Sequence, residues 1–227
     1  MMNPQQEAFT LNEQACVLCG QNKFDEALEL LNKAIELDPE NTNAWYSKAS
    51  CLYSLGKLEE SLRAYVEVLK LSPDDTMTKR LAIIVESESG SRYPELDEYL
   101  DAVECNEFGV QVQTRSAPDS KEALEGALAF YNKAVQLNPN LAQAYNNRGF
   151  VYSKLGRLQD ALLEYERSIQ EKPDYAIAWF NKGQCCLDLL DPGKALICFE
   201  KTLELNPGDK DAIHGLDILR QAGIHQS

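Results

Sequence analysis

Residues 142–175 have the sequence AQAYNNRGFVYSKLGRLQDALLEYERSIQEKPDY. Apolar residues recur every three or four positions on both sides of a Leu-Gly-Arg turn, a pattern typical of two amphipathic helices joined by a tight connection. Pro173 closes the second apolar segment, because proline cannot continue a helix in its interior. The stretch therefore predicts a single helical hairpin.

The same hairpin pattern recurs along the chain. Pro39, Pro73, Pro139, Pro173 and Pro207 each end an apolar-periodic segment. Neighbouring prolines in this series are separated by a constant period of about 34 residues, except that the gap from Pro73 to Pro139 is nearly twice as long. A fixed period of this size is typical of solenoids built from stacked helical pairs. We expect regular hairpins at residues 8–40, 42–74, 142–174 and 176–208.

The residues at fixed positions within each period resemble the tetratricopeptide repeat. That repeat places an aromatic, a small and a bulky residue in its first helix, then a small residue, an aromatic residue and a proline in its second. The resemblance implies an all-α solenoid, a right-handed superhelix of helical hairpins. The matching positions are Trp45, Ala49, Leu52, Ser61, Tyr65 and Pro73 in the second repeat; Tyr145, Gly149, Tyr152, Ala161, Tyr165 and Pro173 in the fourth; and Trp179, Gly183, Cys186, Ala195, Phe199 and Pro207 in the fifth.

Small residues and turn residues make such hairpins physically possible. Gly149 and Ala161 would let two helices cross closely while larger side chains fill the space alongside. Gly56, Gly156 and the Asp191-Pro192-Gly193 sequence supply backbone torsions that tight turns need. The leucine position of the pattern holds long polar or basic side chains, whose stems we expect to cover apolar surface while their heads reach water. These are Gln14, Lys48, Arg148 and Lys182.

The period is lost in the middle of the chain, where the gap between Pro73 and Pro139 falls just short of two full periods. We expect residues 78–87 and 94–104 to form the two helices of a degenerate third repeat. Residues 108–118, FGVQVQTRSAP, alternate valines with polar residues and end in proline, which favours a loop or a short extended segment. Helix should resume after Asp119 or Ser120, since either can cap it.

These segments divide the chain into four parts. Residues 8–74 hold two N-terminal repeats, 75–120 a degenerate repeat with an irregular acidic segment, 121–208 a helix and two C-terminal repeats, and 209–224 a capping helix. Solenoids need a cap with a polar outer face. In the cap we expect Ile213, Leu216 and Leu219 to cover the last repeat, with Asp211, Asp217 and Arg220 facing water.

Charge and hydropathy exclude several classes of partner. The formal net charge of -14 disfavours nucleic acid and anionic membrane surfaces, whose binding depends on basic side chains. Residues 74–108 carry ten acidic and three basic side chains. We interpret them as a solvated face, with a site for a basic partner or an acidic flap as the alternative. No apolar run is long enough to span a membrane and the first residues do not resemble a signal peptide, so we expect a cytoplasmic protein.

The cysteines and histidines indicate neither a metal site nor a catalytic site. Seven cysteines are an odd number and several lie on apolar helix faces, so we expect free, reduced thiols. Cys16 and Cys19 form a CxxC, but zinc needs four ligands and no second pair lies nearby. His214 and His225 have no nucleophile or carboxylate motif beside them. We therefore expect a non-enzymatic protein without metal or cofactor.

The resemblance also implies a binding surface, because in this family the first helices of successive repeats line a groove that receives a peptide or helix of a partner. Aromatic side chains would supply contact area and amides would fix a peptide backbone. Phe150 and Phe180 could instead pack between neighbouring first helices. The candidate residues are Tyr46, Tyr53, Asn146, Asn147, Phe150, Phe180, Asn181 and Leu187, with Asn43, Ser50, Gln143, Lys154, Ile177, Gln184 and Asp188 on the same faces.

One branch of the family binds the C-terminal carboxylate of heat-shock chaperones through lysine, asparagine and arginine side chains. The corresponding positions here hold Asn146, Phe150, Asn181, Asp211 and Gly215, so the sequence does not favour binding of a chaperone tail. We expect an adaptor or scaffold that binds an apolar peptide or helix with basic flanks. The alternatives are a self-associating structural scaffold and, less favoured, a regulatory domain or a co-chaperone without the carboxylate clamp.

Overall fold

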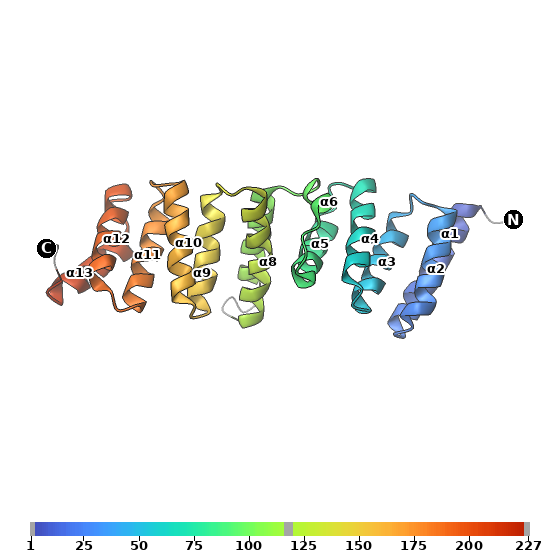
Figure 1. Cartoon of the computed structure of the whole chain (residues 1–227), viewed down its shortest axis with the longest axis horizontal. Coiled ribbons are helices and arrows are strands. Elements are labelled where there is room, and N and C mark those ends of the chain that lie inside the picture. The colour runs from blue at the N-terminus through green and yellow to red at the C-terminus, as the bar shows by residue number, and fades with distance from the viewer. Residues whose placement is uncertain (1–2, 116–119, 225–227) are drawn as a thin grey trace. The chain divides into compact units, whose positions relative to one another are not determined.

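The structure is a computed structural model that describes residues 3–115 and 120–224. Within these residues it contains thirteen helices and no strand (Figure 1). The contacts group the chain into two compact units, Met1–Leu100 and Asp101–Ser227. The all-α repeat fold expected from the sequence is therefore confirmed.

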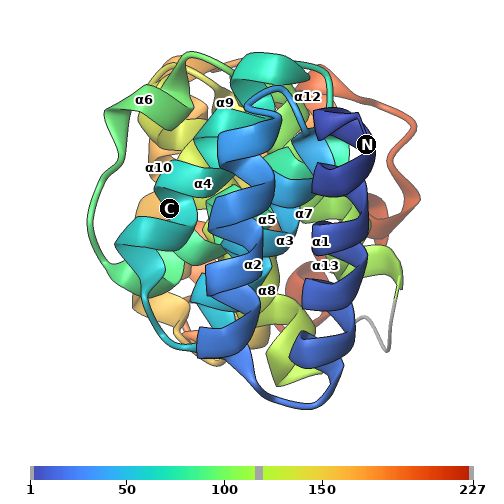
Figure 2. The same ribbon diagram turned by 90° about the vertical axis from the view of Figure 1, so that its right-hand side faces the viewer.

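In the described residues, the N-terminal unit consists of two regular hairpins, one further long helix and a one-turn helix. Figure 2 shows the first two helices running antiparallel, with a short loop between them. The expected hairpins at residues 8–40 and 42–74 are confirmed, although the first helix already begins at Pro4, where Asn3 caps it. The bounds are α1 (Pro4–Gly20), α2 (Phe24–Leu37), α3 (Thr42–Ser54), α4 (Leu58–Leu71), α5 (Thr76–Ser89) and the one-turn helix α6 (Pro94–Asp97).

The C-terminal unit contains three hairpins and a terminal helix. The two regular hairpins expected at residues 142–174 and 176–208 are confirmed. Ser120 caps its helix by accepting a hydrogen bond from the backbone N–H of Ala123, as expected, whereas Asp119 and His225 lie outside the described residues. The bounds are α7 (Ala102–Arg115), α8 (Lys121–Leu137), α9 (Ala142–Lys154), α10 (Leu158–Glu171), α11 (Ala176–Asp188), α12 (Pro192–Leu205) and α13 (Lys210–Gln221).

The middle of the chain differs from the expectation. The loop or extended segment predicted at 108–118 is wrong, because its described part belongs to helix α7. The helix predicted at 94–104 is also wrong, since only the single turn α6 forms there before α7 begins. Burial accounts for the difference: Phe108 is 4% exposed and its ring lies 5.9 Å from that of Phe130 on α8. Tertiary packing thus overrides the strand preference of the valines.

Glycines mark the close helix crossings in the C-terminal unit. A β-carbon at Gly149 would lie 2.8 Å from the ring of Tyr165, and one at Gly183 would lie 2.7 Å from the ring of Phe199. Gly109 has the same relation to a tyrosine of α8, which shows that α7 and α8 form a repeat-like hairpin. The expected partner of Gly149, Ala161, is buried, but the nearest atoms belong to Tyr165 and to the residue before it.

The turns between paired helices need a left-handed residue. Gly56 and Gly156 have φ angles of 72° and 75°, as the sequence predicts. In the last hairpin the expectation for Gly193 is wrong, because Leu190 takes this conformation with φ 59°. Asp191 instead caps α12, accepting from the backbone N–H of Lys194, and Gly193 lies inside the helix.

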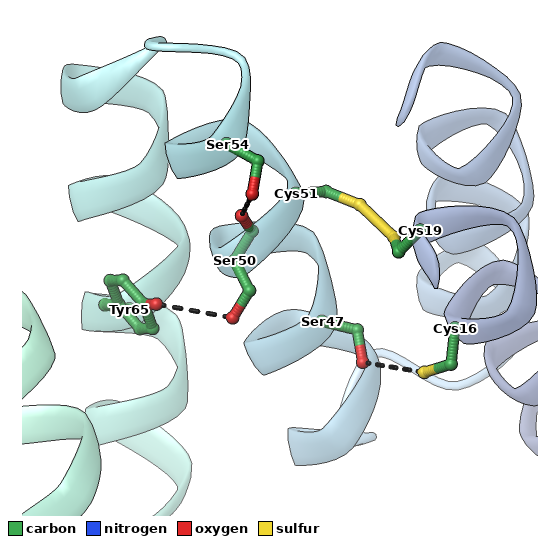
Figure 3. The surroundings of a disulfide bond; sticks show 7 residues. All are labelled: Cys16, Cys19, Ser47, Ser50, Cys51, Ser54 and Tyr65. Carbon is green, nitrogen blue, oxygen red and sulfur yellow. Dashed lines mark hydrogen bonds between the residues drawn. A yellow bond between two sulfur atoms is a disulfide. The ribbon is translucent and has the colours of Figure 1, made fainter. Parts of the chain in front are cut away.

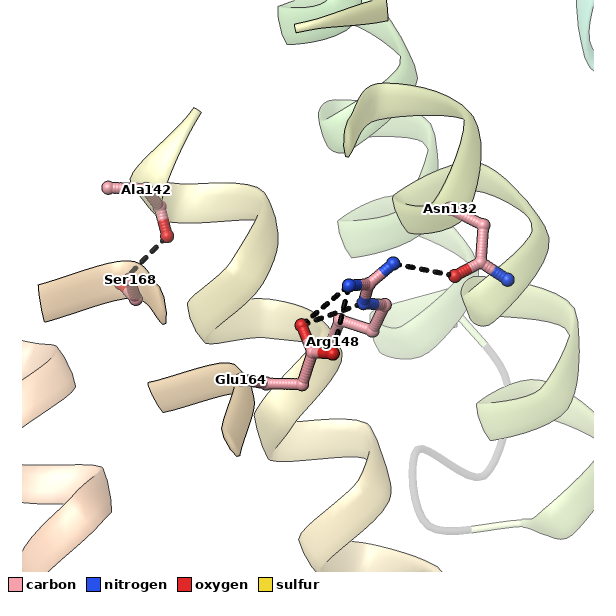
Figure 4. Close-up of polar contacts among 5 residues, drawn as sticks. All are labelled: Asn132, Ala142, Arg148, Glu164 and Ser168. Atoms are coloured by element: carbon pink, nitrogen blue, oxygen red, sulfur yellow. Dashed lines mark hydrogen bonds and ion pairs between the residues drawn. The ribbon is translucent and has the colours of Figure 1, made fainter. Parts of the chain in front are cut away.

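An ion pair occupies the leucine position of the fourth repeat. The Arg148 guanidinium donates through Nε and Nη2 to both carboxylate oxygens of Glu164, at 2.9 Å each, and through Nη1 to Asn132 at 3.1 Å (Figure 4). Both charged side chains are only 16% exposed. The expectation that this head reaches water is therefore wrong: a bidentate ion pair joins α8, α9 and α10.

The terminal helix α13 caps the last repeat with a different face from the one expected. Leu216 and Leu219 are buried and Asp211, Asp217 and Arg220 are exposed, as predicted. Ile213, in contrast, is 41% exposed. Gly215 approaches Phe199 closely: a β-carbon at Gly215 would lie 2.9 Å from the Phe199 ring. This close approach sets the rotation of α13 about its axis, so Ala212 is buried in place of Ile213.

Candidate functional site

The candidate binding residues lie on first helices of hairpins in both units. Tyr46 and Tyr53 belong to α3 of the N-terminal unit, and we call their face, with Ser50, the N-terminal surface. The other six belong to α9 and α11 of the C-terminal unit. Their face, the C-terminal surface, comprises Asn146, Asn147, Phe150, Phe180, Asn181 and Leu187.

On the N-terminal surface the two tyrosines differ in exposure. The Tyr46 ring is half-buried and lies edge-on to Tyr65, with centroids 5.9 Å apart. Tyr53 is 38% exposed, and its hydroxyl donates a 3.0 Å hydrogen bond to the carboxylate of Glu88 on α5. This hydrogen bond to a carboxylate, together with partial burial, raises the pKa of Tyr53. Tyr53 is therefore the more accessible of the two rings.

A disulfide joins Cys19 on α1 to Cys51 on α3, with 6.7 Å between the Cα atoms (Figure 3). The expectation that all seven thiols are free is thus wrong for this pair. The two residues come together because α1 and α3 are the first helices of adjacent repeats and pack side by side. One turn earlier on the same helices, the Cys16 thiol lies 3.6 Å from the Ser47 hydroxyl.

Two of the cysteines outside the bridge are buried packing residues, as expected for thiols on apolar helix faces. Cys185 and Cys186 are each 1% exposed. The Cys185 thiol donates to the carbonyl of Leu158 at 3.3 Å, and burial raises its pKa to about 11. Across residues 3–115 and 120–224, no group of three or more histidine, cysteine or acidic side chains could hold a metal ion.

A chain of asparagine amides crosses the C-terminal surface. The amide of Asn181 donates to Asn146 at 2.9 Å, Asn146 donates to Asn147 at 3.3 Å, and Asn147 donates to Asn106 at 3.0 Å. These four side chains join α11, α9 and α7. Asn106 was not among the candidates, yet aligning Gly109 with Gly149 gives it the same position in its hairpin as Asn146.

The amides of this chain are not equally available to a partner. Asn146 is 4% exposed, so it holds its neighbours in place and offers little surface of its own. Asn147 and Asn181 are half-buried and lie on either side of it. Phe150 is also half-buried, and the ammonium of Lys154 lies 5.4 Å from the centre of its ring.

Phe180 and Leu187 line a hollow of 250 Å³ between α11 and α13. The Phe180 ring also contacts Phe199, at 5.7 Å between centroids, so this side chain both packs and faces the hollow. Ile218, which is 53% exposed, contributes the opposite wall, and Asp211 places a carboxylate at the same site. The full lining is Phe180, Gln184, Leu187, Asp211, His214, Gly215, Ile218 and Leu219.

None of the helices that the structure describes has both the length and the apolar character to cross a membrane. This statement covers the described residues alone.

Comparisons with known proteins place these features in a family. The chain is 26% identical over 150 residues to a probable UDP-N-acetylglucosamine--peptide N-acetylglucosaminyltransferase, SPINDLY, of Hordeum vulgare, covering 62% of this chain and 16% of that protein. It is 24% identical over 218 residues to Hsp70-Hsp90 organizing protein 1 of Glycine max, covering 91% of this chain and 37% of that protein. The chain thus spans well under half the length of either relative.

Among solved structures, YrrB, described as a TPR protein with an unusual peptide-binding site, aligns with 92% of this chain. The alignment covers 92% of YrrB at 20% identity, with a TM-score of 0.43. Family models of the tetratricopeptide repeat match residues 12–76, 120–156, 142–175 and 176–209. With the period, the helical hairpins and the glycine crossings already described, these matches show that the chain belongs to the tetratricopeptide repeat family.

Proposed function

We propose that the chain is a non-enzymatic adaptor or scaffold that binds a peptide or helix of a partner protein. The C-terminal surface is the main contact region, and the hollow between α11 and α13 receives an apolar side chain of the partner. The N-terminal surface, with the exposed ring of Tyr53, is a second contact region. The proposal includes the cytoplasmic location expected from the sequence.

The observation that carries this proposal is the hollow itself. Two residues selected from the sequence as binding residues, Phe180 and Leu187, line it together. Ligand sites in proteins are typically concave and mostly apolar, with a few polar groups that fix orientation. Here Gln184, His214 and Asp211 are the polar members of the lining. An aliphatic or aromatic side chain has the chemistry that fits this combination.

The charge distribution supports a partner segment with basic flanks. The chain has a net charge of -14. Asp211 in the lining, and Asp188 next to Leu187 in the sequence, are exposed carboxylates. Lysine or arginine beside the inserted apolar residue would meet these groups, and such rim charges affect association rate and salt dependence more than final affinity. Raised salt should therefore weaken binding moderately.

The amide chain suggests how an extended partner is oriented. Asn147 and Asn181 are fixed by hydrogen bonds to Asn146, so their positions are set before binding. A fixed side chain loses less conformational entropy on binding than a mobile one. Amide groups can both donate to and accept from a peptide backbone. They therefore suit a segment of varied sequence whose single apolar anchor enters the hollow.

The proposal is tested with short fluorescein-labelled peptides that carry one Leu, Ile or Phe between lysines, compared with the same peptides carrying glutamate in place of lysine. Fluorescence anisotropy measures the dissociation constants. We expect the lysine peptides to bind more tightly. Equal or tighter binding of the glutamate peptides would contradict the proposal that the partner segment has basic flanks.

Two matched substitutions locate the site. Ile218→Asp places a carboxylate in the hollow and should weaken the best peptide at least about tenfold, or roughly 1.4 kcal/mol. Ile197→Asp, on α12, is the control, because Ile197 is 54% exposed, as Ile218 is 53% exposed, but does not line the hollow. We expect it to leave affinity within about twofold. Equal effects of the two substitutions would exclude the hollow as the binding site.

Self-association is the alternative outcome. Light scattering across a range of protein concentrations distinguishes it, because a self-associating scaffold increases in mass with concentration whereas an adaptor stays monomeric. If Ile218→Asp abolishes such an increase and no peptide binds, the hollow is an interface between copies of this chain.

A further inference from the structure

Three cysteines and a serine lie together where the first two repeats meet. The disulfide of Cys19 and Cys51 connects α1 to α3, and Cys16 and Ser47 face each other one turn away (Figure 3). Helices α1 and α3 belong to different hairpins. The bridge is therefore a covalent link between two repeats, within the N-terminal unit.

The repeat period places this link on the N-terminal surface. Cys16 and Cys19 precede Ser50 and Tyr53 by one full repeat. They occupy in α1 the positions that Ser50 and Tyr53 occupy in α3. A hollow of 370 Å³ lies beside the bridge and is lined by Cys19, Gly20, Phe24, Ser50, Cys51 and Ser54.

The two sulfur atoms of the bridge differ in accessibility. Cys51 is 2% exposed, whereas Cys19 is only partly buried and lies near the end of α1, where the hollow opens beside it. The attack of a thiolate on a disulfide requires access to one sulfur. Cys19 is therefore the sulfur that an external reductant can reach, and Cys51 is the leaving group.

We propose that the Cys19–Cys51 disulfide is a reversible redox tie that controls the N-terminal surface by fastening the first repeat to the second. A dithiol reductant opens the tie in two steps. Its thiolate attacks Cys19 Sγ, and the S–S bond breaks with release of the Cys51 thiolate, which takes up a proton. The second thiolate of the reductant then displaces Cys19, which is also protonated, and the reductant becomes a disulfide. Two electrons and two protons thus pass to the protein.

The open and closed states differ in how firmly α1 is held. In the closed state α1 is bonded to α3 as well as packed on α2. In the open state only non-covalent contacts to α2 and α3 hold α1, and an element held by fewer links opens locally more readily. In a reducing compartment, bridges of this kind are formed and broken rather than permanent. The regulatory consequence rests on the proposed function of the N-terminal surface, whereas the reversible tie does not.

The test uses the full chain, oxidised with glutathione disulfide and then reduced with dithiothreitol. Thiol titration under denaturing conditions should count five thiols before reduction and seven after it, because seven cysteines are present and five stand outside the bridge. Hydrogen exchange followed by mass spectrometry should show α1 amides exchanging about tenfold faster after reduction. Amides of the C-terminal unit are the internal control and should be unchanged.

Two variants separate the bridge from general oxidation. Cys19→Ser cannot form the tie, so its α1 amides should exchange at the fast rate under oxidising conditions. Cys16→Ser changes a cysteine of the same helix that is not in the bridge, and it should keep both the slow rate and the response to dithiothreitol. A tie that never forms, with seven thiols after oxidation, would overturn the proposal. So would α1 exchange that is equal in the oxidised, reduced and Cys19→Ser proteins.

Failure of the proposed function leaves a different signature. In that case the thiol count and α1 exchange respond as expected, but the best labelled peptide binds neither redox form. The Ile218→Asp protein, in which the hollow of the C-terminal surface is removed, reports binding to the N-terminal surface. If its remaining peptide binding is equal in both redox forms while α1 exchange changes, the tie does not regulate the N-terminal surface, and the regulatory part of the proposal is refuted.

Discussion

Leu190 stands in a turn that other repeats build with glycine. Its φ angle of 59° compares with 72° for Gly56 and 75° for Gly156. The hydrogen bonds match as well: Leu190 N–H donates to Leu187, three residues earlier, as Gly156 N–H donates to Ser153. We therefore expect Leu190→Gly to stabilise the last hairpin.

The magnitude follows from three contributions. A residue with a β-carbon in the left-handed region costs about 1–2 kcal/mol, and glycine removes this cost. Glycine also increases the conformational entropy of the unfolded chain, and this destabilises the folded state by about 0.5–1 kcal/mol. Leu190 is 89% exposed, so losing its side chain removes almost no buried apolar surface. The net gain is about 0.5–1 kcal/mol, or roughly 1–4 °C in melting temperature for a chain of this length.

Urea denaturation and thermal melting followed by circular dichroism measure this gain. Leu190→Ala is the control, because it removes the same exposed side chain but retains a β-carbon, so it should gain little. The reverse change, Gly156→Leu, should destabilise by about 0.5–1 kcal/mol. If Leu190→Gly lowers the melting temperature, or if the alanine variant gains as much, the left-handed turn is not the source of the effect.

Three further outcomes follow from the core of the C-terminal unit. Arg148→Ala should lower the free energy of unfolding by about 1–3 kcal/mol, because it leaves the Glu164 carboxylate partly buried without its partner. Replacing both Arg148 and Glu164 by methionine should cost less. Urea denaturation measures both variants, and an equal loss of stability in the two would contradict the ion pair. The pKa of the Cys185 thiol, raised by burial to about 11 from 9.0, means that its contribution to stability is complete below pH 9 and is lost as the pH rises toward 11. The urea midpoint should be lower at about pH 10 than at about pH 8, and Cys185→Ala should reduce this difference. An identical difference in the variant would show that other groups cause the loss of stability. Gly149→Leu should destabilise by roughly 1–3 kcal/mol or more, because even its β-carbon would lie 2.8 Å from the Tyr165 ring, and an unchanged melting temperature would show that the helix crossing lies elsewhere.

The regular repeats were predictable because their signals are local and recur. Proline at a fixed spacing, glycine at the crossing and apolar residues every three or four positions all indicate the same hairpin. The eight binding candidates came from the same register, which is why Phe180 and Leu187 were selected together and line one hollow. Their role in binding stays a prediction.

The irregular middle and the disulfide could not be predicted in this way. The valines of α7 favour a strand locally, whereas the packing of α7 on α8, with Phe108 against Phe130, accounts for the helix. Cys19 and Cys51 lie 32 residues apart, which is two short of the period, so they occupy different positions in their repeats. Counting cysteines does not reveal a contact between adjacent first helices. The four-part division at residues 75, 120 and 208 remains a prediction alongside the two units of the structure.

The asparagine chain has a direction. From Asn181 through Asn146 and Asn147 to Asn106, every amide donates toward α7. Each amide has a donor end and an acceptor end, so the same contacts could also form with all donors and acceptors exchanged. If a single amide rotated by 180°, it would place donor against donor or acceptor against acceptor at its neighbours. The four side chains therefore behave as one element with two orientations. On the proposed function, a peptide carbonyl or N–H bound at α11 would select the orientation of the amide at α7, so that binding at one end of the chain of amides would be felt at the other.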